Sequence, residues 1–321
     1  MRRAVRLVAG ALSLAAAGWL LVVVLPRTAG VGWDDTADRV AGLQAWQIIS
    51  LIAVWAAGLW MHTYVLRSAL PGLSRRRAFA LNLGGSSVSN VLPFGGAAGI
   101  GLNYAMLRSW GYSRVQITAF TTISNLVVVL VKVAIAALGI FALVSMPPLA
   151  INLAHPGKKT ALAMGVAVGI IVVATVVVVR WWRGSLRAQL VAALKLVREQ
   201  CAQVLRQGWA AFLIGGIGYP VLQMALLWFC LAALGVEVSP TAVLAVFAVE
   251  RLLTLVPFTP GGVGLVETAA TAVLAGFGAD PAAAASGVIL FRVFSYLIEI
   301  PLGAIVAVAW FARGRTPALA Q

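Results

Sequence analysis

The sequence predicts an all-α, polytopic helical membrane protein. We expect a single integral membrane domain over residues 1–321, with about six full spans and two re-entrant helical hairpins in an inverted repeat. Hydrophobic residues make up 62% of the 321 residues and charged residues only 10%, whereas soluble domains average roughly 45–50% and about 25%. In addition, long apolar runs recur along the chain, and one motif rich in proline and glycine occurs twice.

Six apolar runs approach or exceed the ~20 residues that a helix needs to cross about 30 Å of hydrocarbon. They are Leu7–Leu25, Ala45–Leu66, Ile117–Val144, Ala161–Val179, Trp209–Gly235 and Ala282–Phe311. The first follows three arginines, as a signal peptide does, but it is longer than the usual signal core and no small-residue cleavage site follows it. We therefore expect the first run to be an uncleaved span.

The net charge of +15 suggests nucleic acid as a partner for a soluble protein, so the location of the charges matters. With a cytoplasmic N-terminus, seventeen Lys and Arg residues lie in inner segments and four, Arg27, Arg39, Lys158 and Lys159, in outer segments. Lys and Arg near span ends are retained on the cytoplasmic side. Orientation therefore accounts for the charge, both termini are expected in the cytoplasm, and no nucleic-acid partner is needed.

One segment between the fourth and fifth spans, at about residues 185–207, is amphipathic. Its apolar residues recur at helical spacing while Arg187, Lys195, Arg198 and Arg206 lie elsewhere on the helical wheel. This pattern predicts a helix lying on the inner leaflet. A connector helix packed against the bundle fits the pattern equally well.

The repeated motif is "NVLPFGGAAGIGL" at Asn90–Leu102 and "TLVPFTPGGVGLV" at Thr254–Val266. A short apolar piece, a Gly-containing turn and a long span follow each copy, so we expect two repeats, at about 45–144 and 209–311. Arginines flank the first copy and Glu237 and Asp280 flank the second, which predicts entry from opposite sides. Neither half of a copy can cross alone. Inverted repeats of this kind place a binding site near the midplane.

Irregular backbone at membrane depth is tolerated only where protein or water surrounds it. The motif therefore predicts a polar cavity. In the second copy, prolines end the incoming half-helix, glycines permit a tight reversal, and the outgoing half-helix begins with N–H groups that favour an anion. The expected lining residues are Asn90, Pro93, Gly95, Gly96, Pro257, Pro260, Gly261, Gly262 and Gly264. Simple kinks or a surface loop remain the alternative.

Six charged residues fall inside apolar segments, and their charges sum to zero: Lys132, Glu250, Arg251, Glu267, Arg292 and Glu299. A charge at the bilayer centre costs roughly 2.5–3.5 kcal/mol, so such residues face the interior of the bundle. Arg292, Tyr296 and Glu299 share one helix face by their spacing. The repeat alignment further suggests that Lys132 meets Glu299. Ion pairs that only hold the bundle together remain the alternative.

The cysteines and histidines lack the spacing of a disulfide framework or a metal site. We therefore predict no metal, no cofactor and no catalytic residue. No ATP-binding motif is present either, so any uphill transport would need a proton or ion gradient, with Glu267 or Glu299 as the proton carrier.

The pattern of Glu250-Arg251, Pro257 to Gly264, Glu267, Arg292 and Tyr296 resembles the transmembrane family of lysylphosphatidylglycerol synthase, also described as flippase-like membrane proteins. The resemblance is strongest over Glu250–Ala312 and weaker over Asn90–Tyr112. It implies membrane lipids as partners and a translocase in the bacterial cytoplasmic membrane, moving a phospholipid or a polyprenyl-phosphate-linked lipid between leaflets. It also implies that Arg251, Glu267 and Arg292 hold the headgroup.

Two other functions fit the sequence. An integral-membrane glycosyltransferase using a polyprenyl-phosphate sugar donor would use Asp34 and Asp35 of the first outer loop as base and metal ligand. A non-transporting accessory subunit is the other. The sequence predicts no particular oligomeric state.

Overall fold

The computed structural model describes residues 32–92, 95–144, 209–254 and 260–312, together with Trp19, Val22 and Val23. Every regular element within these ranges is helical, which confirms the predicted all-α membrane fold. The expected spans Leu7–Leu25 and Ala161–Val179 and the amphipathic segment 185–207 lie outside the described residues. Pro93 and Pro257 also lie outside them.

Four long apolar helical stretches in the described part are long enough to cross a membrane. They are α4 (Ala45–Ala69), α7 (Arg114–Val144), α10 (Trp209–Ala233) and a continuous stretch made of α13 (Pro281–Arg292), a π-helical turn η4 (Val293–Leu297) and α14 (Glu299–Ala312). At 1.5 Å per residue, a helix of 25 residues such as α4 extends about 38 Å. These stretches coincide with four of the six predicted spans.

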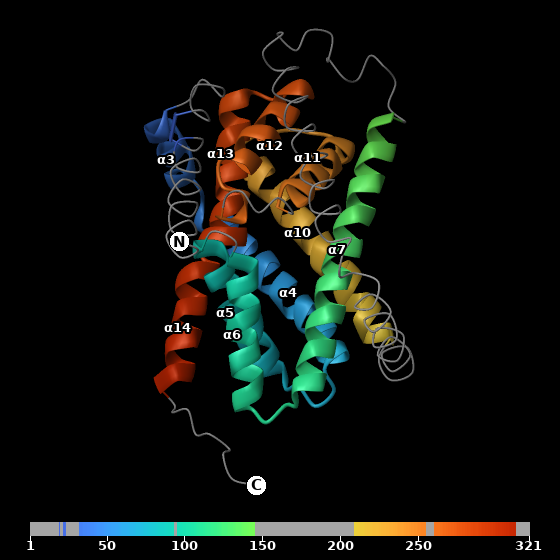
Figure 1. Ribbon diagram of the computed structural model, residues 1–321. Helices are drawn as coiled ribbons and strands as arrows, with labels where there is room; N and C mark the ends of the chain where they lie inside the picture. Colours follow the sequence, from blue (N-terminus) through green and yellow to red (C-terminus); the bar gives the residue numbers. More distant parts are fainter. Residues whose placement is uncertain are drawn as a thin grey trace, which may run out of the picture.

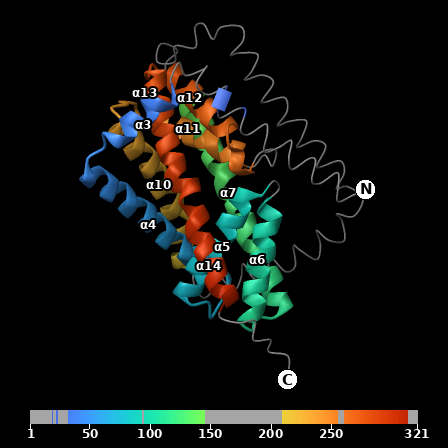
Figure 2. The same cartoon turned by 90° about the vertical axis from the view of Figure 1, so that its left-hand side faces the viewer.

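Four shorter helices form two pairs that are too short to span a membrane by single crossings. The first pair is α5 (Arg75–Val91) and α6 (Gly95–Ser109), and the second is α11 (Pro240–Leu253) and α12 (Leu265–Gly276). A short 3₁₀ turn, η3 (Pro260–Gly262), precedes α12, and α3 (Trp33–Ala41) precedes α4. The α5–α6 pair occupies the lower half of the molecule and the α11–α12 pair the upper half (Figure 1). The view from the side shows the same separation (Figure 2).

The same local sequence signals start the first helix of each pair. A glycine with positive φ ends the preceding turn, Gly72 at 81° and Gly235 at 75°. A serine then caps the new helix: Ser74 Oγ accepts from the next turn at 3.3 Å, and Ser239 Oγ at 3.2 Å. Such caps satisfy N–H groups that have no partner within the helix.

The signals also recur where each pair ends. Gly111 and Gly278 have φ values of 89° and 87°, a conformation in which residues with a Cβ are strained. Ser113 then caps α7 and Asp280 caps α13, each through a side-chain oxygen that accepts a backbone N–H three residues on. The chain thus passes twice through the same order of turns, caps and helices.

Close packing of small residues joins the long helices. Where α4 crosses α10, a Cβ on Gly215 would lie 2.8 Å from the carbonyl oxygen of Met61, so only glycine allows this approach. One buried apolar cluster, including Leu227, Phe247 and Phe291, joins α10, α11 and α13, and a second joins α4 to α7. Van der Waals contact of this kind drives helix association in lipid, where apolar surface gains nothing by burial.

Candidate functional site

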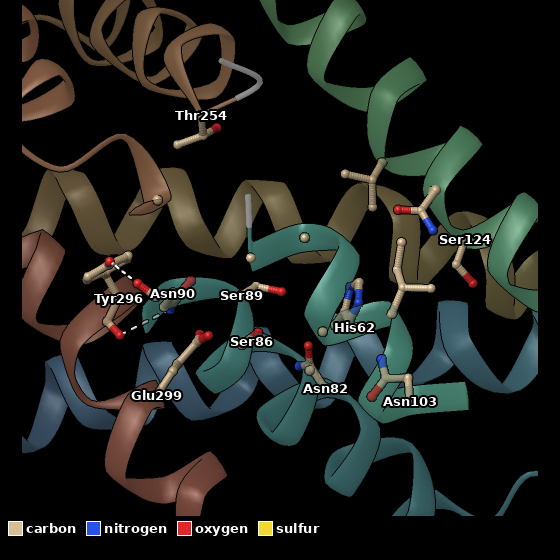
Figure 3. Close-up of a pocket in the computed structure, with 18 of the residues that line it drawn as sticks. His62, Asn82, Ser86, Ser89, Asn90, Asn103, Ser124, Thr254, Tyr296 and Glu299 are labelled. Atoms are coloured by element: carbon tan, nitrogen blue, oxygen red, sulfur yellow. Dashed lines mark hydrogen bonds between the residues drawn. The ribbon is translucent and has the colours of Figure 1, made fainter. Parts of the chain in front are cut away.

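A cavity of about 760 Å³ lies where the inner ends of the two helix pairs meet. It is partly open, and its lining combines charged, amide and hydroxyl side chains with backbone of both pairs (Figure 3). The predicted site residues that line it are Asn90, Gly95, Gly96, Lys132, Glu250, Arg251, Gly261, Gly262, Arg292, Tyr296 and Glu299. Two further predicted residues, Gly264 and Glu267, do not line it, and the side chain of Pro260 lies outside the described part of the structure.

Four charged side chains form a chain of alternating sign beside the cavity. Arg251 pairs with its neighbour Glu250, and Glu250 Oε1 lies 4.0 Å from Arg292 Nη1. Arg292 Nε in turn donates to Glu267 Oε1 at 2.7 Å. Both glutamates and Arg292 are buried. Buried charges are tolerated when each has a partner, so this chain explains how two carboxylates and two guanidinium groups remain at this depth.

Glu267 holds the start of α12. Its Oε2 accepts from the backbone N–H of Gly264 at 2.6 Å, while Oε1 accepts from Arg292. The anion expected at the start of this half-helix is therefore the protein's own carboxylate. Both carboxylate oxygens thus accept hydrogen bonds within the protein, and contact of Glu267 with a headgroup stays a prediction.

Gly261 forms the tip of the α11–α12 pair, and its φ of 57° matches the predicted tight reversal. Its carbonyl oxygen accepts from Arg292 Nη2 at 2.7 Å. A Cβ at this position would lie 2.0 Å from Cε2 of Tyr296, so the ring packs directly on the glycine backbone. Only glycine satisfies both the φ angle and this contact.

Tyr296 also joins the two pairs. Its hydroxyl donates to the carbonyl oxygen of Asn90, and Asn90 Nδ2 donates back to the carbonyl oxygen of Tyr296 at 3.3 Å (Figure 3). Asn90 lies in the last turn of α5, whereas Tyr296 lies in the π-helical turn between α13 and α14. Single π-helical turns inside α-helices are frequent at functional sites. This one brings Tyr296 between the tips of both pairs.

Lys132 differs from the other cations in its partner. Its Nζ donates to Thr254 Oγ1 at 3.0 Å, and among the described residues no carboxylate lies within 4.0 Å of it. The predicted meeting of Lys132 with Glu299 is wrong. Helix α7 packs against α11, and Thr254 directly follows the end of α11, whereas α14 packs against α5 and holds Glu299 beside Ser86.

Glu299 is the predicted proton carrier that faces the cavity. It is 5% exposed and, among the described residues, has no cation within 4.0 Å. Figure 3 shows its carboxylate directed toward the α5 segment that carries Ser86 and Ser89. Glu299 therefore forms no ion pair within the described residues, in contrast to Glu267.

Sequence reasoning overlooked the uncharged polar lining. It comprises His62, Asn82, Ser86, Ser89, Asn103, Thr121, Ser124, Asn125, Tyr219, Gln223, Thr254 and Ser295. A signal was present in α5, because Asn82, Ser86 and Ser89 are four and three residues apart and so share one helix face. Apart from Asn90 and Tyr296, the prediction weighed only charges, prolines and glycines at membrane depth.

The residues proposed for a glycosyltransferase lie elsewhere. Asp34 and Asp35 are exposed in the first turn of α3, where Asp35 Oδ2 accepts from Gly32 N at 3.2 Å. Neither residue lines the cavity. Within the described ranges, no group of three or more His, Cys, Asp or Glu side chains is placed to hold a metal ion.

Comparison with known proteins identifies a family that matches this chain. The family described as "Lysylphosphatidylglycerol synthase TM region" has a model that matches residues 6–303, nearly the whole chain. No curated protein matches the chain.

Proposed function

The chain belongs to the lysylphosphatidylglycerol synthase TM region family, and from this premise and the cavity we propose that it is a lipid translocase. It moves a phospholipid or a polyprenyl-phosphate-linked lipid between leaflets. One observation carries the proposal: a cavity of about 760 Å³, lined by charged and polar as well as apolar side chains, at the two short helix pairs and among helices long enough to cross a membrane. Such a cavity suits a polar headgroup crossing hydrocarbon.

An inverted repeat would give this cavity access to both sides in turn. The repeated order of turns, caps and helices supports two equivalent units, at about 45–144 and 209–311. Their opposite directions support inversion: α4 descends and α7 ascends in Figure 1, whereas α10 ascends and the α13–α14 stretch descends. On this interpretation both short pairs are re-entrant hairpins that meet near the midplane.

The distribution of charged residues supports one orientation of the protein in the membrane. The lower end of the molecule, where α5 begins and α6 ends, carries Arg75, Arg76, Arg77 and Arg108, whereas Glu237 and Asp280 lie in the turns at the upper end. By the positive-inside rule the lower end faces the cytoplasm. The α5–α6 hairpin then enters from the cytoplasmic side and the α11–α12 hairpin from the outer side.

The cavity's charges favour a phosphate. Its lining holds three cations, Lys132, Arg251 and Arg292, and two carboxylates, Glu250 and Glu299. Arg292 is committed to Glu267 and Gly261. Lys132 has no carboxylate within 4.0 Å among the described residues, so it is the cation best placed to bind a lipid phosphate, with Thr254 beside it. Charge-assisted hydrogen bonds to phosphate are strong.

Reconstitution into liposomes tests the proposal. Lipids labelled on an acyl chain, from a panel of anionic, aminoacylated and polyprenyl-phosphate types, should cross faster in proteoliposomes than in protein-free liposomes. Lys132→Met should slow crossing about tenfold or more, since a hydrogen bond to a charged group contributes roughly 1.5–3 kcal/mol. Lys132→Arg, which keeps the charge, is the control and should retain most of the rate. Crossing no faster than without protein, for every lipid, would contradict the proposal.

A further inference from the structure

One side of the cavity is built from uncharged polar side chains of three different helices. Asn82 comes from α5, Asn103 from α6 and Gln223 from α10. Figure 3 shows Asn82 and Asn103 near His62, on the side of the cavity away from Tyr296. We refer to Asn82, Asn103 and Gln223 as the amide side.

The amides of this side have unused hydrogen-bonding capacity. Asn82 Nδ2, Asn103 Oδ1 and Gln223 Oε1 are buried and have no hydrogen-bond partner within the described residues. Gln223 is 2% exposed and lines the cavity. Nearly all buried polar atoms in proteins are paired, so three unpaired atoms around one cavity indicate that something in the cavity pairs with them.

Helix packing positions this side. A Cβ on Gly85 would lie 2.7 Å from Asn103 Nδ2, so the Asn103 amide occupies the space that a glycine on α5 leaves open. A Cβ on Gly99 would lie 2.2 Å from Ser89 Oγ. Two glycines thus allow α5 and α6 to approach closely and present their amides to the same space.

The amide side offers no negative charge. Helices α4, α5, α6, α7 and α10 contain no Asp or Glu. Glu250, the carboxylate that α11 adds to the lining, is already paired with Arg251, and Glu299 lies on the Tyr296 side of the view (Figure 3). His62 adds no negative charge either. A cationic group placed here would lose its hydration without gaining a counterion.

We propose that the amide side is a subsite for the uncharged, hydroxyl-bearing part of a lipid headgroup, a polyol or a sugar, rather than for a cationic aminoacyl or amine group. Each hydroxyl both donates and accepts, which matches the unpaired donor of Asn82 and the unpaired acceptors of Asn103 and Gln223. The subsite rests on the proposed translocase function, in which Lys132 takes the phosphate and the amide side takes the group beyond it.

Matched lipids test the subsite. Phosphatidylglycerol and phosphatidylethanolamine carrying the same labelled acyl chain present a hydroxyl-bearing and a cationic headgroup. In proteoliposomes the glycerol lipid should cross about tenfold faster than the ethanolamine lipid. Asn82→Leu should lower this ratio toward one, and Asn82→Asp should reverse it by supplying a carboxylate for the ammonium. Because Lys132 is present in all three proteins, its effect on the ratio cancels.

Ser87→Ala is the control on the same helix. Its hydroxyl is buried and donates to Gly84 O at 2.9 Å, but it does not line the cavity, so the ratio should stay at the wild-type value. Equal rates for the two lipids, or ratios within twofold of wild type in both Asn82 variants, would overturn the subsite.

A binding measurement separates failure of the subsite from failure of translocation. Calorimetry with the purified protein in detergent should detect tighter binding of glycerol phosphate than of phosphoethanolamine, and Asn82→Leu should remove that difference. If this holds while no lipid crosses in liposomes, the subsite stands and the translocase proposal falls. If the two soluble phosphates bind equally, the subsite is overturned whatever the transport result.

Discussion

The two short helix pairs share their turns and caps but differ in chemistry. The α5–α6 pair contributes amides and hydroxyls to the cavity, from residues such as Asn82 and Asn103, and no carboxylate. The α11–α12 pair and the adjoining α13 contribute the ion-pair chain. The comparison teaches that one local architecture, used twice, can give a cavity one charged side and one uncharged side.

The pairs also differ in what holds their tips. In the first pair, glycines allow backbone contact: a Cβ on Gly95 would lie 2.1 Å from Ser89 O. In the second, Arg292 bridges Glu267 and the carbonyl oxygen of Gly261. Substitutions that add bulk should therefore destabilise the first tip, and substitutions that remove a charge should destabilise the second. Substitutions of Tyr296, which contacts both pairs, should affect both tips.

The largest effect should come from Arg292→Met. Removing one partner of a buried ion pair leaves an uncompensated charge, so the free energy of unfolding should fall by about 3–5 kcal/mol. Denaturation in mixed detergent micelles measures this change. Combining Arg292→Met with Glu267→Gln should restore much of the loss, because the unpaired carboxylate is then neutral. A fall below about 1 kcal/mol in the single variant would show that the pair does not hold the second tip.

An intermediate effect should follow Gly95→Ala, compared with Gly96→Ala. The first adds a methyl group against the Ser89 carbonyl oxygen, whereas a Cβ on Gly96 meets nothing within 4 Å. Overpacking costs about 1–3 kcal/mol, while alanine in an open helical position gains up to about 1 kcal/mol over glycine. The two neighbouring variants should thus shift the unfolding free energy in opposite directions. A shift of the same sign and size in both would refute close packing at the first tip.

The smallest effect should come from Tyr296→Phe. This variant keeps the ring over Gly261 but removes the hydroxyl that donates to the Asn90 carbonyl oxygen. A hydrogen bond contributes about 1 kcal/mol net, so the unfolding free energy should fall by roughly that amount. Tyr296→Ala, which also removes the ring, should cost clearly more. Equal losses in the two variants would mean that the hydroxyl, and not the ring contact, joins the pairs.

Local features were predictable because they depend on neighbouring residues. Apolar length predicted the four described spans, and the glycines of the second motif do adopt positive φ at Gly261, Gly262 and Gly264. Lys132 and Glu299 were predicted as site residues because they are charges within apolar segments, and both line the cavity. Partners were predicted less well, because which atoms meet depends on which helices pack together.

By itself, the sequence determined the membrane class of the protein, the approximate extent of its four described spans and the glycines of the second motif that adopt positive φ. Hydrophobic length, caps and backbone freedom act within a few residues. The tertiary structure alone decided that Arg292 pairs with Glu267, that Lys132 meets Thr254 and that amides of α5, α6 and α10 converge. Lys132 and Thr254, for example, are 122 positions apart in the sequence. They exist only once close packing of the long helices has set the distances between side chains.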